Sequence, residues 1–198
     1  MDLLLIRHGQ SNANAKGLLI ATEQDELTEL GKLQSIQLAA TLKNFRFTQP
    51  SLLFCSPWMR ARQTAALVFG PSAQIQYDSR LAETHPGIFG TWLEADFNRI
   101  YPDFSNDIQN RYEQGESHLD MANRVREWVD CQILTHTHES GLAVVVAHGG
   151  PISVVIQQLL GIPIETHYPS FTVPNASFTY LKWRPDLGRY CLERAGHI

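Results

Sequence analysis

Two histidines in this chain each follow a short apolar run and come directly before a glycine. His8 follows Leu3–Ile6 and Arg7, and His148 follows Leu142–Ala147. Runs of this length, rich in branched residues, are typical of buried strands. Ligands of an open α/β sheet bind just beyond the carboxyl ends of its strands. Two histidines placed there, one of them beside an arginine, predict an anion site that contains a nucleophile or a proton carrier.

The first of these segments has the residues that phosphoryl transfer requires. A neutral imidazole can attack phosphorus, and the phosphohistidine that forms divides one difficult step into two, so His8 is a candidate nucleophile. Arg7 can clamp phosphate oxygens with its planar guanidinium group, and Asn14 can add a neutral donor. Taken alone, an Arg-His pair is more often a polar strand end with a surface histidine.

Two later segments could complete the same anion site. We expect Arg60 within about one turn of a helix that begins at Ser56–Pro57, where free backbone amides favour anions. Gly149–Gly150 would let the backbone approach a ligand, and a helix beginning at Pro151 would point its amides at the same place. The alternative for His148 is a core histidine whose hydrogen bond goes to a backbone carbonyl.

Cleavage of a phosphate ester also needs a proton at the leaving oxygen. Glu83 is a candidate donor, because a carboxyl group beside bound phosphate has its ionised form disfavoured. His85 is the alternative donor, two residues along the chain. His136 and His138 have the composition of a metal pair, but no third and fourth ligands follow at suitable spacing, so we expect no metal site.

The elements that must position these residues alternate between strands and helices. We expect strands at 3–6, 52–55, 75–77, 142–147, 177–183 and 190–193, and helices at 28–45, 58–69, 118–136 and 151–161. This alternation predicts a three-layer, doubly wound α/β fold with a mostly parallel central sheet. Residues 10–14 are expected to form a loop. The aromatic and turn-rich stretch at about 81–117 is expected to be a helical insertion over the sheet edge, near the site.

Composition limits the class of protein. With 198 residues, 43% of them apolar, the chain can bury one core, and we expect a single domain over residues 1–198. Its net charge of −4 argues against a broad nucleic-acid surface. Three widely spaced cysteines favour free thiols in a reducing compartment, and neither a signal peptide nor a membrane span is evident. We therefore expect a cytoplasmic protein.

Together these segments resemble the histidine phosphatase superfamily, in its phosphoglycerate-mutase-like branch. The resemblance runs from Met1 to about Gly161, and its motifs are Arg7-His8-Gly9 with Ser11 and Asn14, Leu27–Gly31, Ser56–Ala65, Leu81-x-Glu83, Gly115-Glu116-Ser117 and Val146–Gly150. It implies that His8 is the phosphorylated nucleophile and that Glu83 is the proton donor. It also implies a phosphate pocket of Arg7, Arg60 and His148, assisted by Asn14, with no metal or organic cofactor.

The resemblance implies a phosphomonoesterase for a small phosphorylated metabolite, releasing inorganic phosphate. The alternatives are a cofactor-primed phosphoglycerate mutase and a non-catalytic module that binds phosphorylated ligands. Mutases of the family carry an adjacent arginine pair in the insertion, whereas this chain has only the separated Arg99 and Arg111. It also lacks an obvious long tail to keep water from a phosphoenzyme, which favours the phosphatase. The insertion would crowd a phosphohistidine-protein substrate. We expect a monomer or homodimer, with no nucleic-acid or membrane partner.

Overall fold

The structure, a computed structural model, describes residues 1–47 and 49–198. Within those residues, six strands form one sheet in the order β3-β2-β4-β1-β5-β6. Their bounds are β1 (Asp2–Arg7), β2 (Leu52–Cys55), β3 (Gln76–Tyr77), β4 (Leu142–Ala147), β5 (Phe178–Arg184) and β6 (Arg189–His197). Strands β1 to β4 pair in parallel, and β5 runs antiparallel to both of its neighbours. The predicted α/β fold with a mostly parallel sheet is confirmed.

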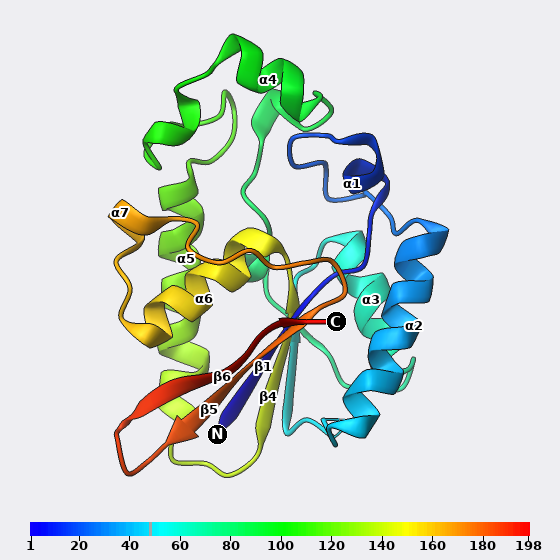
Figure 1. Cartoon of the computed structure of the whole chain (residues 1–198), viewed down its shortest axis with the longest axis vertical. Helices are drawn as coiled ribbons and strands as arrows, with labels where there is room; N and C mark the ends of the chain where they lie inside the picture. Colours follow the sequence, from blue (N-terminus) through cyan, green and yellow to red (C-terminus); the bar gives the residue numbers. More distant parts are fainter. Residues whose placement is uncertain (48) are drawn as a thin grey trace.

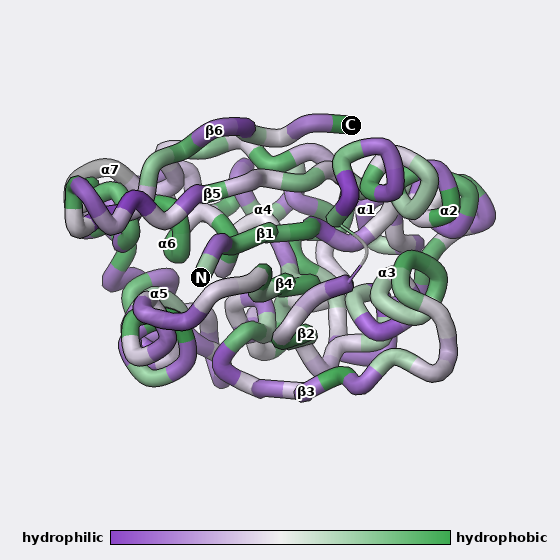
Figure 2. The backbone as a smooth tube through the Cα atoms, turned by 90° about the horizontal axis from the view of Figure 1, so that it is seen from below, coloured by the Kyte–Doolittle hydropathy of each residue, from purple (hydrophilic) through white to green (hydrophobic). Residues whose placement is uncertain are grey.

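Helices cover both faces of this sheet (Figures 1 and 2). One face carries α2 (Glu29–Asn44) and α3 (Met59–Phe69), and the other carries α5 (His118–Gln132) and α6 (Gly149–Leu160). Three short helices lie in the connections: α1 (Asn12–Lys16), α4 (Glu94–Ile100) and α7 (Ile164–His167). No helix in the described part of the chain is long and apolar enough to cross a membrane.

Residues 3–6 of β1 and all of β4 are apolar because both faces of these central strands are covered. Leu3 and Leu5 of β1 pack into the core beneath α5 and α6, whereas Leu4 and Ile6 pack into the core beneath α2 and α3. All four side chains are fully buried. Successive strand residues point to opposite faces, so a strand covered on both sides needs a continuous apolar run. Figure 2 shows the apolar β1 and β4 in the middle of the sheet.

Several predicted helix boundaries are confirmed and two starts are wrong. Thr28 is the N-cap of α2, and Gly161 ends α6 in the left-handed conformation. Helix α3 begins at Met59 and not at Ser56–Pro57, because Trp58 is still extended. The Ser56 Oγ accepts from the Trp58 N–H at 3.3 Å and lies 2.7 Å from His148 Nε2. Helix α6 begins at Gly149, two residues before Pro151.

The expected loop at residues 10–14 was also wrong in part. It contains the start of α1, whose capping box pairs Ser11 with Asn14: each side chain accepts a hydrogen bond from the other residue's backbone N–H. This reciprocal arrangement satisfies two amides that a short helix would otherwise leave free. The small polar residues therefore encode a fixed turn of helix shortly after His8.

The insertion at 81–117 contains α4 and several single turns of 3₁₀ helix. Its own core consists of Phe89, Phe97 and Tyr112, which are all buried. Figure 1 shows α4 beyond the carboxyl ends of the strands, so the insertion covers that end of the sheet and not a lateral edge. This position places the segment over the ends of β1 and β4.

Candidate active site

His8 directly follows β1 and is held in one tautomer. The ring is only 2% exposed, its Nδ1 lies 2.7 Å from the carbonyl oxygen of Gly9, and Arg60 Nε donates to its Nε2 at 3.0 Å. An arginine N–H can only donate, so Nε2 is the acceptor and the proton is on Nδ1. Burial, followed by the charges of Arg60 and Arg7, keeps the pKa of His8 well below 6.5. The ring is thus neutral, with a lone pair on Nε2.

Arg60 is buried and fixed by several partners. Besides His8 it contacts the backbone oxygens of Ile20 and Thr22, each at 3.4 Å, and forms an ion pair with Asp25 at 3.6 Å. Burial lowers the pKa of Arg60 to about 10, while the nearby carboxylates oppose that shift. The guanidinium therefore stays charged at neutral pH.

Arg7 is the second cation of the site, after Arg60. Its Nη1 donates to the backbone oxygen of Val173. A Cβ built on Gly149 would lie 3.6 Å from the central guanidinium carbon, so the first turn of α6 adjoins Arg7. The structure thus brings Arg7 and Gly149 together, as predicted. The Nε of Arg7 is buried with no hydrogen-bond partner among the described residues.

His148 lies beside His8 and has no exposed surface. Its ring centroid is 5.0 Å from that of His8 and 5.2 Å from the nearer ring of Trp58. Its Nε2 lies 2.7 Å from the Ser56 hydroxyl, while Nδ1 is buried without a partner in the described structure. Burial, then the charge of Arg60, holds the pKa of His148 well below 6.5. The alternative of a core histidine with satisfied hydrogen bonds therefore accounts for Nε2 only, because Nδ1 remains unbonded in the described structure.

Glu83 reaches the same place from the insertion. Its Oε2 accepts from the backbone N–H of Gly150 at 3.2 Å, and its Oε1 accepts from that of Thr84 at 3.0 Å. His85, in contrast, is exposed and lines a separate hollow with Trp58 and Pro86. The geometry favours Glu83 over His85 as the proton donor.

Arg124 of α5 fixes the backbone that carries Glu83. Its guanidinium donates to the carbonyl oxygens of Arg80, Ala82 and Glu83 at 2.7–2.8 Å. It also holds Glu116 through two parallel hydrogen bonds of 2.9 and 2.8 Å. Such a fork-to-fork pair adds geometric specificity as well as charge. The sequence analysis missed this residue, although Glu116 belongs to a motif that it singled out.

Asn14 adjoins the site through the last segment before β5. Its Oδ1 accepts from Asn175 Nδ2 at 3.1 Å, and the same Nδ2 lies 3.1 Å from the backbone oxygen of His8. The backbone N–H of Ala176 also donates to that oxygen, at 3.0 Å. Asn175 thus connects the two predicted residues, and nothing in its own sequence neighbourhood indicated this.

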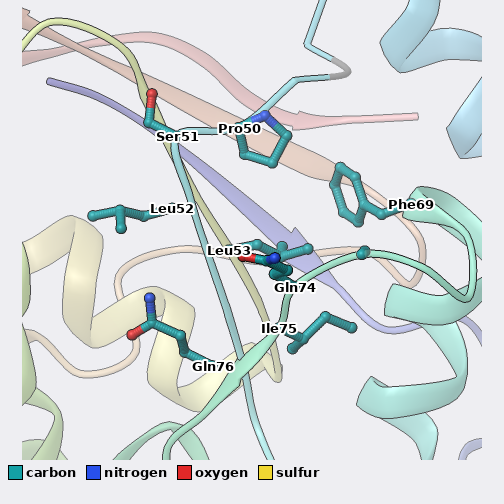
Figure 3. Close-up of a pocket in the computed structure, with 9 residues that line it drawn as sticks. Pro50, Ser51, Leu52, Leu53, Phe69, Gln74, Ile75 and Gln76 are labelled. Atoms are coloured by element: carbon teal, nitrogen blue, oxygen red, sulfur yellow. The ribbon is translucent and has the colours of Figure 1, made fainter.

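These side chains surround a cavity of about 190 Å³. Its lining consists of Arg7, His8, Asn14, Leu18, Leu19, Ile20, Arg60, Glu83, His118, Gly150 and Tyr168. His148 lies behind this lining, next to His8. The sequence analysis missed His118, although it directly follows the Gly115-Glu116-Ser117 motif, and it missed Tyr168, which has no motif around it. A larger cavity of about 420 Å³ beside β2 and β3 has no titratable side chain among its described lining residues (Figure 3).

Other candidate chemistry lies outside this cavity. The described residues contain no group of three or more His, Cys, Asp or Glu side chains placed to hold a metal ion. Cys55 is buried, which raises the pKa of its thiol to about 12, whereas Cys131 is exposed. A thiol with so high a pKa is not ionised at neutral pH and is a poor nucleophile.

Comparison with known proteins agrees with this geometry. The family model of the histidine phosphatase superfamily (branch 1) matches residues 3–192. The chain belongs to this superfamily. Within it, a glucosyl-3-phosphoglycerate phosphatase of Mycobacterium tuberculosis is 31% identical over 92% of this chain and 86% of its own length. The corresponding phosphatase of Mycolicibacterium vanbaalenii is 30% identical over 90% of this chain and 83% of its own.

Solved structures of the superfamily share the whole fold. A mycobacterial glucosyl-3-phosphoglycerate phosphatase in complex with VO3 superposes with a TM-score of 0.85 at 28% identity, covering 100% of this chain and 99% of the other. The α-ribazole phosphatase of Shigella flexneri gives a TM-score of 0.84 at 25% identity, covering 100% and 98%. The sheet and its covering helices are therefore those of the superfamily.

Proposed function

We propose that this protein is a phosphomonoesterase that hydrolyses a small phosphorylated metabolite through a phosphohistidine intermediate on His8. The observation that carries the proposal is the tautomer of His8, in which Nδ1 bears the proton beside the Gly9 carbonyl oxygen and Nε2 bears the lone pair beside Arg60. Arg60 Nε donates to that lone pair in this structure, so a bound phosphoryl group must take over this hydrogen bond before Nε2 attacks. Arg7, Arg60 and Glu83 line the same cavity as His8. This is the set of groups that phosphoryl transfer to nitrogen requires.

The reaction follows from these positions. His8 Nε2 attacks phosphorus, the bond between phosphorus and the ester oxygen breaks, and Glu83 gives its proton to the departing alcohol. In the second half, the Glu83 carboxylate takes a proton from water, which attacks the phosphohistidine. Inorganic phosphate leaves, and His8 and protonated Glu83 are restored.

The charge on the transferring phosphoryl group is stabilised by buried polar groups that lack a full set of hydrogen bonds within the protein. Arg7 Nε and His148 Nδ1 are buried without hydrogen-bond partners among the described residues. A buried polar atom in that state is costly unless a ligand bonds it. Arg7 and Arg60 can neutralise charge on the transferring phosphoryl group, whose oxygens gain donors prepared in advance. No step in this scheme is assigned to a metal.

A phosphatase is favoured over a mutase by the positions of the two insertion arginines. Arg99 pairs with Asp96 and Arg111 pairs with Asp120, and neither arginine lines the cavity. Binding of substrate by both side chains would require both ion pairs to break. The cytoplasmic location and the monomeric or homodimeric state stay predictions.

The test is hydrolysis of phenyl phosphate with excess chelator, comparing the wild type with His8→Ala. We expect turnover in the wild type, a loss of at least about 10³-fold in His8→Ala, and an acid-labile phosphoenzyme in the wild type alone. Arg62→Lys is the matched surface control, since Arg62 is exposed and contacts Tyr77 outside the site. Activity retained by His8→Ala would disprove the mechanism.

A further inference from the structure

The cavity is divided between a charged part and an uncharged part. Arg7, His8, Arg60 and Glu83 form the first, where the phosphoryl group must lie. The second consists of three aliphatic side chains, Leu18–Ile20, and two rings, those of His118 and Tyr168. The proposed mechanism gives this second set no role, yet a leaving group bound to the phosphoryl group must contact it.

Both walls of the uncharged part are anchored. On the aliphatic wall, the backbone N–H of Leu19 donates to the carbonyl oxygen of Trp92 at 3.0 Å, and Leu18 forms a bridge with Leu93. On the ring wall, the centroids of His118 and Tyr168 are 5.3 Å apart. The Tyr168 hydroxyl would lie 2.9 Å from a Cβ built on Gly150, so this ring reaches the first turn of α6. These walls can therefore select a shape.

Both cations of the cavity are needed by the phosphoryl group, which is close to a dianion at neutral pH, so no cation is left for a second anionic group. Arg60 also contacts His8 and two backbone oxygens, and Arg7 Nη1 bonds the backbone. Among the lining residues these are the only arginines or lysines. Arg124, the next cation behind Glu83, is engaged by Glu116 and three carbonyl oxygens. A carboxylate on the leaving group would be desolvated here without a counter-charge, which is costly.

We propose that the leaving group of the substrate is a small uncharged alcohol with an apolar face, bound between Leu18–Ile20 and the rings of His118 and Tyr168. The protein then discriminates against phosphorylated acids. This inference rests on the proposed function and adds the class of substrate.

His118 supplies the polar contact of this subsite without adding charge. Its Nδ1 lies 3.2 Å from the Thr84 hydroxyl, which leaves Nε2 for other bonds. Burial lowers the pKa of His118, so the ring is neutral at ordinary pH, although the charge of Glu83 opposes the shift. A neutral imidazole can bond a hydroxyl or amide group of the leaving alcohol and gives a carboxylate no ionic attraction.

The decisive measurement compares two esters that differ only in charge. 4-Carbamoylphenyl phosphate and 4-carboxyphenyl phosphate have nearly the same shape, and phenyl phosphate serves as the common reference. We expect kcat/KM for the carbamoyl ester to exceed that for the carboxy ester by about tenfold or more. A smaller ratio, or a preference for the carboxy ester, overturns the inference while leaving the phosphatase intact. Failure to hydrolyse any of the three overturns the proposed function as well.

A charge placed in the subsite gives an independent check. Leu19→Lys should raise the relative kcat/KM of the carboxy ester by about tenfold, because it supplies the missing counter-charge. Leu19→Gln controls for the lost apolar surface, and Leu33→Lys controls for an added lysine elsewhere. Leu33 is 63% exposed on α2 and lines none of the cavities described above. If Leu19→Lys and Leu19→Gln give the same ratio of kcat/KM for the carboxy and carbamoyl esters, the assigned subsite is wrong.

Discussion

Replacement of Gly150 by alanine should inactivate the site without unfolding the protein. A Cβ at Gly150 would lie 2.4 Å from Glu83 Oε1, and ordinary contact begins at 3.4 Å, so the carboxylate must move by about 1 Å. Its bond to the Gly150 N–H, now 3.2 Å, would be lost in that movement. The Cβ would also lie 2.9 Å from the Tyr168 hydroxyl and 3.2 Å from Met121 Cε, but all three atoms are the ends of side chains, so the protein can accommodate the methyl group.

The size of the effect follows from the distance moved. A misplacement of about 1 Å can cost about 10²-fold in rate, and complete loss of a general acid costs about 10²–10⁴-fold. We therefore expect kcat on phenyl phosphate to fall about 10²-fold, which corresponds to nearly 3 kcal/mol of transition-state stabilisation. Stability should change little, because alanine is about 1 kcal/mol better than glycine within a helix and partly offsets the new contact.

The assay compares leaving groups as well as variants. 4-Nitrophenol leaves without needing a proton. The fold-loss in kcat caused by Gly150→Ala should therefore be about tenfold smaller on 4-nitrophenyl phosphate than on phenyl phosphate. Gly149→Ala is the matched comparator, because its Cβ would make only ordinary contact, 3.6 Å from the Arg7 guanidinium carbon. Equal losses in the two variants, or equal losses on the two esters, would refute the assignment of Glu83 as the proton donor.

Three further predictions concern protonation and positioning. Because the folded chain keeps the pKa of His8 and His148 well below 6.5, the unfolded chain binds more protons below that pH. The free energy of unfolding should then fall by about 1.4 kcal/mol per pH unit for each histidine as the pH drops below 6.5, and urea unfolding at pH 7.5 and 5.5 measures this. Arg60→Lys should lower kcat by about 10²–10³-fold, since lysine cannot both donate to His8 and span the same partners, while Arg62→Lys stays at the wild-type rate. Arg124→Gln should destabilise the fold by about 2–3 kcal/mol and lower kcat, and a thermal melt together with the phenyl phosphate assay would expose either prediction as wrong.

The sequence predicted the part of the site that lies at strand ends. His8 and His148 follow continuous apolar strands that pair with each other, so the parallel sheet itself brings the two rings together. Arg60 was placed by the same logic, even though its helix starts at Met59 and not at Ser56. That error arose because a serine before a proline is a typical cap signal, whereas here the backbone stays extended through Trp58 even though Ser56 Oγ accepts from its N–H.

Contacts between distant segments could not be predicted in this way. Tyr168 and Asn175 reach the site from the connection between α6 and β5, where no periodic pattern or motif fixes the backbone. Arg124 looked like one more polar position on an amphipathic helix, and its role depends on carbonyl groups about 40 residues earlier in the chain. Such residues are positioned by tertiary packing, which local sequence propensity does not predict.

The position of β1 in the sheet also has a consequence during synthesis. This strand, whose four central residues are apolar, pairs with β4 and β5, which are made much later. At about 5–20 residues per second, β1 waits on the order of ten seconds for β4 to be translated. Throughout that interval its exposed edges are open to wrong partners, so a nascent chain has reason to engage a holding chaperone. The backbone oxygen of His8 also accepts from the N–H of Ala176, so the contacts around His8 are complete only after residue 176 has been made.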